Sequence, residues 1–449
     1  MKTPFEITID TLLNLGERST AISLVDAFAK HAHGVEQHDQ VAYLYRLVKL
    51  PLKAIEYGEK ALNLALNFDQ AMAVRSNLVG LYNNANYPEK ALHLIRQLEV
   101  ANPRDASHLA DKSFSYFLLN EKEKAEGVIR DELNNLYLTD EKRTRLNFNL
   151  GAYELLKDNF QTGLRKFLFE GRKLDLWKKP QLPFRFWEGD IEPGEKIILL
   201  AEAGIGDEFI NVRFMKHLER LGMKPIWYST NQDTVDVFKR CGYNSISKIN
   251  QNDFHMDTLW THSMDVPIFL NLQYPDLWDG PYITAQPDLA NDIVKQSSKL
   301  KIGIRWQGNP EYDQDLHRSV PLKDFYEVLK NVNADLYSLQ RDVGLDELKQ
   351  FPDIVDLSSK LTSFEMTLSV MSKLDLIVTS CTSIAHAAAA MGKKVVVFTP
   401  ISSYYVWCHS GNRSPWYGDN VKLIRQTKPR VWDDPQKELE QYLKEEGML

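Results

Sequence analysis

The sequence predicts an α-helical repeat region followed by two α/β units. Residues 1–176 show helical periodicity with almost no strand-like alternation. Residues 177–194 are rich in proline and glycine, which is typical of a linker. After the linker, short apolar runs alternate with amphipathic helices, and we divide this part into units at 195–290 and 291–449.

The bulk composition is that of a globular protein with more than one domain. The chain has 449 residues, of which 43% are hydrophobic and 26% charged, so it can bury substantial cores. A length of this size suggests about three domains. The net charge of -7 argues against a general affinity for nucleic-acid phosphates, because such affinity requires clustered Lys and Arg.

The cysteines and the N-terminus predict a cytoplasmic protein. Cys241, Cys381 and Cys408 lie far apart, with neither metal-ligand nor disulfide spacing, which favours a reducing compartment. The first residues contain no apolar segment typical of a secretory signal. We also find no apolar run of about 18 residues, the length that crosses a bilayer, and therefore expect no membrane span.

The N-terminal region contains a repeat marked by small residues. Their spacings are 33, 37, 34 and 38, and the residues are Ala21, Ala54, Ala91, Ala125 and Gly163. Twelve positions before the last four lie Ala42, Val79, Ser113 and Gly151, and nine positions before lie Tyr45, Tyr82, Tyr116 and Glu154. Small residues at both places allow the two helices of a hairpin to approach closely. The pattern resembles the tetratricopeptide (TPR) repeat, whose period is about 34 residues, and the alternative is an irregular helical bundle.

A TPR-like solenoid implies a binding role. Stacked helical hairpins form a curved array with a concave surface that suits a partner. This surface identifies no chemistry by itself.

The remaining motifs resemble a family of glycosyltransferases over residues 184–426. In chain order they are FWEG, LLAEAGIGDEFINVRF, MDVP, GIRWQGNP, HRSVPL, YSLQ, LDLIVTSCTSIAHAAAAMGK and SPWYGDNVKLIRQ. The chain resembles TPR-linked glycosyltransferases related to the bacterial heptosyltransferases (ADP-heptose transferases) and, more distantly, protein O-linked N-acetylglucosamine transferases. The resemblance implies a GT-B fold of two Rossmann-like units, with the acceptor on 195–290 and the nucleotide-sugar donor on 291–449.

Asp207 is the predicted catalytic base. Gly204 and Gly206 allow a tight turn that places Asp207 at the positive end of a helix, facing the cleft between the two units. A carboxylate there can accept the proton of an attacking hydroxyl, and the family's proposed base is the aspartate of this Gly-Asp pair. The alternative is that Asp207 or Glu208 merely caps the helix.

An anion site is predicted where a buried strand leads into an alanine-rich helix. Free backbone N–H groups near Thr382 and Ser383, with the helix dipole, suit a diphosphate leaving group. His386 lies on the first turn and either hydrogen-bonds the donor or packs. The family usually has aspartate where this chain has Cys381, which puts the grip on the donor in doubt. A Cys381–His386 nucleophile is disfavoured because no other motif supports hydrolase or acyl-transfer chemistry.

Further donor-binding residues are expected around the same cleft. The planar guanidinium of Arg318 suits a phosphate, and Gln307 and Asn309 offer hydrogen bonds to sugar or phosphate. Gln340 ends a strand where the family approaches the nucleotide base, although an exposed strand end is the alternative. Gly206 completes the predicted donor-binding set.

The role of the aromatic residues stays open. Trp306 either stacks on a ring or belongs to the core. A second aromatic group is either a flexible lid or a structural floor, and it comprises Tyr404, Tyr405, Trp407, Trp416 and Tyr417.

The sequence favours a metal-independent enzyme. Asp313-Gln314-Asp315 matches an Asp-x-Asp metal motif, but it lies in a polar loop and does not follow a hydrophobic strand. We expect no metal and no cofactor other than the nucleotide sugar, which is a co-substrate.

The predicted function is inverting transfer of a sugar from a nucleotide sugar to a protein or glycan acceptor held by the TPR-like repeats. The motifs do not distinguish hexosyl from pentosyl transfer, nor do they specify the nucleotide, the acceptor or the oligomeric state. One alternative is a catalytically decayed TPR scaffold, which Cys381 favours and Asp207 and Arg318 oppose. Another is a transferase acting on modified bases of nucleic acid, which the acidic balance disfavours.

Overall fold

The computed structural model describes residues 3–103, 107–135, 137–176, 181–341 and 343–449. The chain divides into two units. The first comprises Met1–Leu138, Asn309–His317 and Thr427–Val431, and the second comprises Thr139–Gly308, Arg318–Gln426 and Trp432–Leu449. The start of the predicted linker, residues 177–180, lies outside the described residues.

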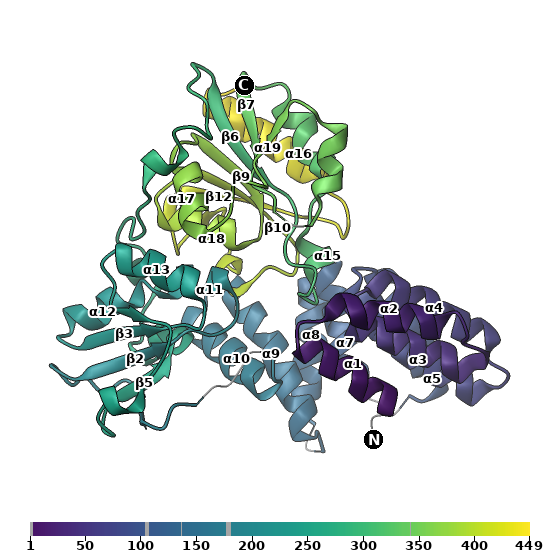
Figure 1. Ribbon diagram of the computed structural model, residues 1–449. Helices are drawn as coiled ribbons and strands as arrows, with labels where there is room; N and C mark the ends of the chain where they lie inside the picture. The colour runs from purple at the N-terminus through teal and green to yellow at the C-terminus, as the bar shows by residue number, and fades with distance from the viewer. Residues whose placement is uncertain (1–2, 104–106, 136, 177–180, 342) are drawn as a thin grey trace. The chain divides into compact units, whose positions relative to one another are not determined.

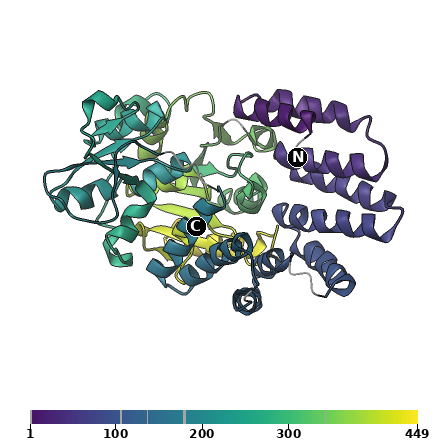
Figure 2. The same ribbon diagram turned by 90° about the horizontal axis from the view of Figure 1, so that it is seen from below.

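The first unit contains a row of helical hairpins, which Figures 1 and 2 show side by side. Each helix packs against its hairpin partner, and neighbouring hairpins pack on one another. The helices are α1 (Pro4–Asn14), α2 (Arg18–Ala29), α3 (Gly34–Leu47), α4 (Pro51–Leu64), α5 (Phe68–Asn84), α6 (Pro88–Ala101), α7 (Leu109–Leu118) and α8 (Lys122–Leu133).

A fifth hairpin, α9 (Asp140–Leu156) and α10 (Phe160–Lys173), belongs to the second unit by its contacts. Its helices approach so closely that a Cβ on Gly151 would lie 2.7 Å from the Phe167 nitrogen. The sequence placed this hairpin with the other helices, whereas its packing partners include the α/β part of the chain.

The repeat is visible in the backbone of every hairpin turn. The turn residue has a left-handed conformation five positions before each small residue of the repeat, and these residues are Gly16, Lys49, Asn86, Asn120 and Asp158. In each turn an N–H bonds the carbonyl five residues earlier, as from Leu50 to Tyr45 and from Tyr87 to Tyr82. This is the Schellman geometry that ends helices. The five small residues therefore share one position relative to the hairpin turns.

A five-stranded parallel sheet forms the first half of the α/β part. Its strand order is β1-β5-β2-β3-β4. The strands are β1 (Arg185–Phe186), β2 (Lys196–Leu200), β3 (Lys224–Tyr228), β4 (Ser245–Ile246) and β5 (Leu259–His262). Its helices are α11 (Ile205–Asn211), α12 (Phe214–Arg220), α13 (Gln232–Arg240) and α14 (Val266–Phe269).

A seven-stranded sheet forms the second half, in the order β11-β12-β10-β9-β6-β7-β8. All of its pairings are parallel except that of β11 with β12. The strands are β6 (Leu300–Arg305), β7 (Ala334–Ser338), β8 (Ile354–Asp356), β9 (Leu376–Ser380), β10 (Val395–Thr399), β11 (Arg413–Ser414) and β12 (Gly418–Arg425). The helices are α15 (Asp315–Arg318), α16 (Leu322–Leu329), α17 (Phe364–Ser372), α18 (Ser383–Ala390) and α19 (Asp433–Glu445).

These two sheets explain the apolar runs in the sequence. The inner strands β9 and β10 are buried along their whole length, as expected for parallel strands covered on both faces. The carboxyl ends of neighbouring strands lie at one edge of each sheet, and polar residues follow them there. The α/β part is therefore two Rossmann-like units, as the sequence predicts.

Arg213, between α11 and α12, joins the two halves of the α/β part. It is buried, and its guanidinium donates to the carbonyls of Ile210 (2.7 Å) and Leu277 (2.8 Å) and to the Tyr282 hydroxyl (2.6 Å). It also donates to the carbonyl of Trp416, which lies between β11 and β12. One buried cation therefore links both sheet regions through backbone oxygens.

Among the described residues, no helix combines the length and the apolar character needed to span a membrane.

Candidate active site

Asp207 uses its two carboxylate oxygens differently. Oδ2 accepts the backbone N–H of Gly204 at 3.1 Å and so caps helix α11. Oδ1 accepts the hydroxyl of Tyr404 at 2.5 Å. Tyr404 follows β10, so this bond joins the two halves of the α/β part. The capping alternative therefore describes one oxygen, and the other is turned toward the facing half.

The environment of Asp207 suits proton transfer. Its side chain is only 8% exposed, and burial raises its pKa to about 6. The hydrogen bonds from Tyr404 and Gly204 and the positive charge of Arg318 oppose this rise. A carboxylate with a pKa near the working pH is partly ionised and well matched to general-base catalysis.

Glu208 is hydrogen-bonded within the first half of the α/β part. Its Oε2 accepts the hydroxyl of Thr234 at 2.7 Å and the indole N–H of Trp227 at 3.4 Å. Burial raises its pKa. The side chain is turned into the first half of the α/β part and does not share the environment of Asp207.

Gly206 lies where the starts of helices α11 and α18 meet. A Cβ at this position would lie 3.1 Å from Cδ2 of His386 and 3.4 Å from Cα of Ser383. The absence of a side chain allows the two helices to approach this closely. The glycine therefore brings the carboxylate of Asp207 beside the N-terminus of α18.

The start of α18 has the features of an anion site. Thr382 precedes the helix in an extended conformation, and its side chain does not cap the first turn. Ser380 Oγ, at the end of β9, is buried and has no hydrogen-bond partner among the described residues. Arg318 donates to the Cys381 carbonyl at 3.0 Å and so brings a positive charge to the same place. Helix N–H groups and a guanidinium together suit a phosphate group.

His386 is held as a neutral ring. Its Nδ1 lies 3.0 Å from the Tyr417 hydroxyl, and its ring stacks on Trp407 at 4.8 Å. Burial, with the charges of Arg213 and Arg318, lowers its pKa to about 3. A neutral imidazole at physiological pH can donate or accept a hydrogen bond but supplies no positive charge.

Cys381 is buried against the indole ring of Trp407. Its Sγ accepts the indole N–H of Trp407 at 3.1 Å. The thiol thus has a packing role where the resembled family carries a carboxylate.

The amide of Gln340 is already used inside the fold. Its Oε1 accepts the N–H groups of Trp306 and Gln307, and its Nε2 donates to the carbonyls of Gln307 and Val343. Gln307 in turn donates to Glu347 at 2.6 Å. Gln340 therefore fastens the loops after β6 and β7 together, and its donor-binding role stays a prediction.

Asn309 belongs to the first unit, where its Oδ1 accepts the N–H of Glu311. The structure does not group it with Asp207. Its predicted contact with the donor stays a prediction as well.

The aromatic residues form a floor. Trp306 is completely buried, and its indole donates to Glu347 at 3.1 Å, which settles it as a core residue. Four of the five residues of the second aromatic group are also buried, namely Tyr405, Trp407, Trp416 and Tyr417. The fifth, Tyr404, is half-buried and is the residue that reaches Asp207.

A buried charge cluster near Asp207 escaped the sequence analysis. Arg172 of α10 binds Asp265 at 2.7 and 2.9 Å and Glu202 at 2.6 Å. Burial outweighs these ion pairs and raises the pKa of Glu202 to about 7 and that of Asp265 to about 6. The position of Glu202, just after β2 and before the Gly-Asp turn, was the available signal.

The acidic pair of the Asp-x-Asp motif lies in the first unit. Asp313 forms an ion pair with Lys49. Within the described ranges, no three His, Cys, Asp or Glu side chains gather as metal ligands would.

Comparisons with known proteins give distant structural matches only. No family model and no curated protein matches the sequence. A glycosyl transferase family 9 structure from Veillonella parvula matches with a TM-score of 0.40 and 11% identity, covering 57% of this chain and 91% of that one. E. coli ADP-heptose LPS heptosyltransferase II matches with a TM-score of 0.33 and 12% identity, covering 56% and 99%.

A mutant O-GlcNAc transferase from Thermobaculum terrenum matches with a TM-score of 0.30 and 13% identity, covering 90% of this chain and 85% of that one. These structural neighbours are of the kinds that the sequence motifs resemble, and the scores are low.

Proposed function

We propose that this protein is a metal-independent, inverting glycosyltransferase of the GT-B type that uses a nucleotide sugar. The observation that carries the proposal is the meeting of a buried base, Asp207, with the anion site at the start of α18. Transfer from a nucleotide sugar requires these two elements, a proton acceptor for the nucleophile and a site for the departing diphosphate.

The proposed reaction is a single displacement at the anomeric carbon of the donor sugar. The oxygen of an acceptor hydroxyl attacks the anomeric carbon, and Asp207 takes the hydroxyl proton. The bond between the anomeric carbon and the diphosphate oxygen breaks with inversion, and the nucleoside diphosphate leaves with the electron pair. The start of α18 and the guanidinium of Arg318 stabilise the charge that develops on it, which is the part a metal ion plays elsewhere.

The helical hairpins support a large acceptor. Five hairpins share one turn geometry and one packing register, as TPR-type arrays do, and such arrays present extended surfaces to partners. We assign the acceptor to a protein or glycan on this basis.

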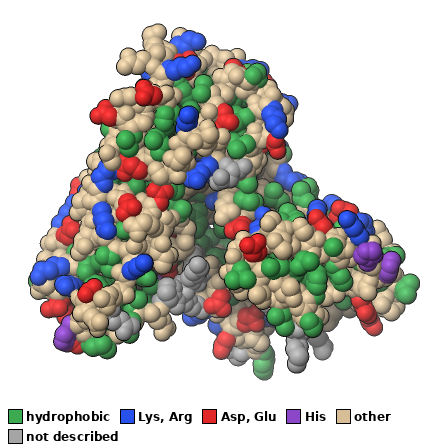
Figure 3. All heavy atoms as spheres, viewed as in Figure 1, with side chains coloured by type: hydrophobic (Ala, Val, Ile, Leu, Met, Phe, Trp, Pro, Cys, Tyr) green, Lys and Arg blue, Asp and Glu red, His purple; other side chains and the backbone are tan. Residues whose placement is uncertain are grey.

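Two alternative functions are a catalytically decayed scaffold and action on nucleic acid. Cys381, whose thiol is buried against Trp407, favours the decayed scaffold. Action on nucleic acid requires a concentrated positive surface, whereas Figure 3 shows acidic and basic side chains interspersed on the face viewed.

The first test is thermal stabilisation across a panel of nucleotides and nucleotide sugars, with and without a chelator. A ligand that binds only the folded protein raises its apparent stability with concentration. We expect a shift with one nucleotide family that the chelator does not change. A panel without any shift points to the decayed scaffold, and a shift abolished by the chelator overturns metal independence.

The second test is Asp207→Asn. Asparagine can still accept the Gly204 N–H, so the helix cap is kept, while the proton acceptor is lost. We expect transfer to fall by about a hundredfold or more, with donor binding retained. Glu208→Gln is the matched control, because Glu208 faces Thr234 and Trp227, and it should keep most of the activity. Full turnover in Asp207→Asn would remove this residue from the base role.

A further inference from the structure

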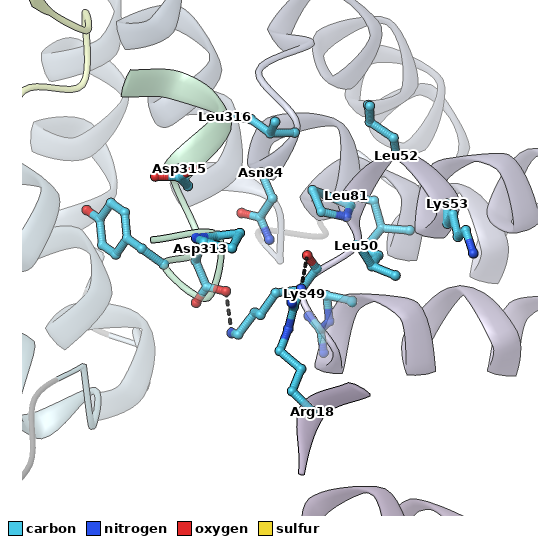
Figure 4. Close-up of a pocket in the computed structure, with 14 residues that line it drawn as sticks. Arg18, Lys49, Leu50, Leu52, Lys53, Leu81, Asn84, Asp313, Asp315 and Leu316 are labelled. Carbon is cyan, nitrogen blue, oxygen red and sulfur yellow. Dashed lines mark hydrogen bonds and ion pairs between the residues drawn. The ribbon is translucent and has the colours of Figure 1, made fainter. Parts of the chain in front are cut away.

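A cavity of about 330 Å³ lies within the first unit, at the turn between α3 and α4. Figure 4 shows its wall, which the hairpin helices form together with the segment Asn309–His317. Such a volume is near the lower limit of ligand pockets, about 300–1,000 Å³. It can admit one or two side chains of a larger partner.

The lining combines positive charge with apolar surface. Four cationic side chains, Arg18, Arg46, Lys49 and Lys53, contribute against two acidic ones, Asp313 and Asp315. Lys53 forms an ion pair with Asp26 at 2.7 Å, and Arg18 donates to the carbonyls of Val48 and Lys49. Leu50, Pro51 and Leu52 add the apolar part, with Leu81 and Leu316 behind them. Leu52 is 55% exposed, although it lies on the first turn of a helix, where a polar residue is usual.

The exposed leucine of this lining belongs to one hairpin. The residues equivalent to Leu52 are all polar, namely Ser19 in α2, Glu89 in α6, Glu123 in α8 and Gln161 in α10. The first turns of α2, α4 and α10 carry no acid, and among these α4 has an apolar residue at this position. An acid in the first turn interacts favourably with the helix dipole. Helix α4 lacks this interaction and begins with an exposed apolar side chain.

Lys49 adds a second departure from the repeat. It has a left-handed backbone with φ 59° where the equivalent positions are Gly16, Asn86, Asn120 and Asp158. A left-handed conformation costs a residue such as lysine about 1–2 kcal/mol, whereas glycine, asparagine and aspartate tolerate it. Strain that persists at one position of a repeat indicates a local function.

An acidic segment of the chain already lies on this surface. Asp313 pairs with Lys49, as Figure 4 shows. His317 anchors the same segment, with Nε2 at 3.0 Å from the carbonyl of Asn83. The resident segment shows which chemistry the surface accepts, a carboxylate on a lysine beside leucine side chains.

We propose that this cavity is a docking site for an acidic segment of a protein partner, with one apolar side chain inserted beside Leu50 and Leu52. The carboxylates of the segment lie toward Arg46 and the start of α4, and toward Lys53, which exchanges part of its pairing with Asp26 for the segment. The occupant is a peptide because the site needs an apolar anchor as well as negative charge. The proposal does not depend on sugar transfer, since docking requires no donor.

The probe is a fluorescein-labelled heptapeptide with six acidic residues around a central leucine, titrated with the full chain by fluorescence anisotropy. We expect saturable binding that weakens as the salt rises from about 50 to 150 mM, because exposed charge pairs are screened over this range. A peptide with serine in place of leucine should bind about tenfold more weakly, the loss expected for one buried apolar side chain.

The matched variants follow from the repeat. Leu52→Glu installs the residue found in α6 and α8, so the fold should persist, and binding should fall by about tenfold or more from the lost contact and the new like charge. Lys53→Ala should weaken binding by a few fold, about the size of one surface pair. The control is Lys124→Ala, at the equivalent position of α8, which should leave binding unchanged.

Melting curves check that each variant folds. Equal binding of the leucine and serine peptides would overturn the proposal, because charge alone would explain it. Unchanged binding in Leu52→Glu would overturn it too. Displacement of the peptide by an oligonucleotide at equal charge concentration, with Leu52→Glu having no effect, would assign the surface to nucleic acid.

Discussion

The Tyr404 hydroxyl donates a 2.5 Å hydrogen bond to Oδ1 of Asp207, from the half of the α/β part opposite to the one that carries the carboxylate. It occupies the carboxylate oxygen that does not cap α11. A hydroxyl donor lowers the pKa of a carboxylate by stabilising its charged form. Tyr404 therefore bears on the proton affinity of the proposed base.

Tyr404→Phe should move the acidic limb of the pH–rate profile to higher pH. The limb reports the ionisation of Asp207, whose pKa of about 6 already includes the lowering by Tyr404. Without this hydrogen bond the pKa rises, a smaller fraction of Asp207 is ionised at pH 7, and transfer there falls. Tyr243→Phe is the control, since its buried hydroxyl bonds the Tyr282 carbonyl. A limb that stays in place would contradict the role given to Tyr404.

Gly206→Ala should impair both stability and donor binding. The new methyl group would meet His386 at 3.1 Å and the backbone of Ser383 at 3.4 Å, so the starts of α11 and α18 must move apart. Overpacking of this kind costs about 1–3 kcal/mol, measurable by urea unfolding. Gly80→Ala is the control, because its Cβ would meet no atom within 4 Å. Alanine in that helix should instead stabilise by up to about 1 kcal/mol.

Arg172→Met should destabilise the protein in a pH-dependent way. It leaves Glu202 and Asp265 buried without their cation, a loss of about 3–5 kcal/mol for a broken buried pair. Both carboxyl groups have folded-state pKa values, about 7 and about 6, above their unfolded values. Between the unfolded-state and folded-state pKa values of these groups, the folded form binds more protons than the unfolded form. The free energy of unfolding therefore falls as the pH rises through this range.

The loss in Arg172→Met should accordingly be larger at pH 8 than at pH 5, when urea unfolding is measured at both. Lys173→Met removes the neighbouring cation, whose partner Glu170 lies in an exposed pair. That change should cost less than about 1 kcal/mol at either pH. Equal losses at pH 5 and pH 8 in Arg172→Met would mean that the cluster does not titrate as described.

Lys49→Gly should stabilise the fold slightly. Glycine adopts the left-handed turn without strain, which offsets its greater entropy in the unfolded chain and the lost pair with Asp313, so we expect a gain of up to about 1 kcal/mol. Asn120→Gly, at the equivalent turn, should change stability by a few tenths because asparagine tolerates this conformation. The melting temperatures of the two variants and of the unmodified protein test this prediction. Destabilisation by Lys49→Gly would show that the contacts of the lysine outweigh the backbone strain.

Local features of the fold were predictable from the sequence. The spacing of Ala21, Ala54 and Ala91 gave the hairpin register because close helix packing needs a small residue at each crossing. The Gly-Asp turn at 206–207 indicated the start of a helix, and continuous apolar runs indicated buried parallel strands. Each of these depends on residues near one another in the chain.

The remaining features depend on tertiary contacts. Nothing in the neighbourhood of Tyr404 indicates that its hydroxyl reaches Asp207, almost two hundred positions earlier. The grouping of Asn309 with the first unit has the same origin, and so does the pairing of Arg172 with Asp265. Gln340 illustrates a further limit, since an amide at a strand end looks free until its four partners are known.

Arg213 sets a limit on how the α/β part can move. A swing of one half away from the other would pull this guanidinium off the carbonyl of Trp416, while its hydrogen bonds to Ile210 and Leu277, within its own half, would persist. A hydrogen bond from a charged donor contributes about 1.5–3 kcal/mol, so its loss would add to the free energy of any state in which the two halves separate.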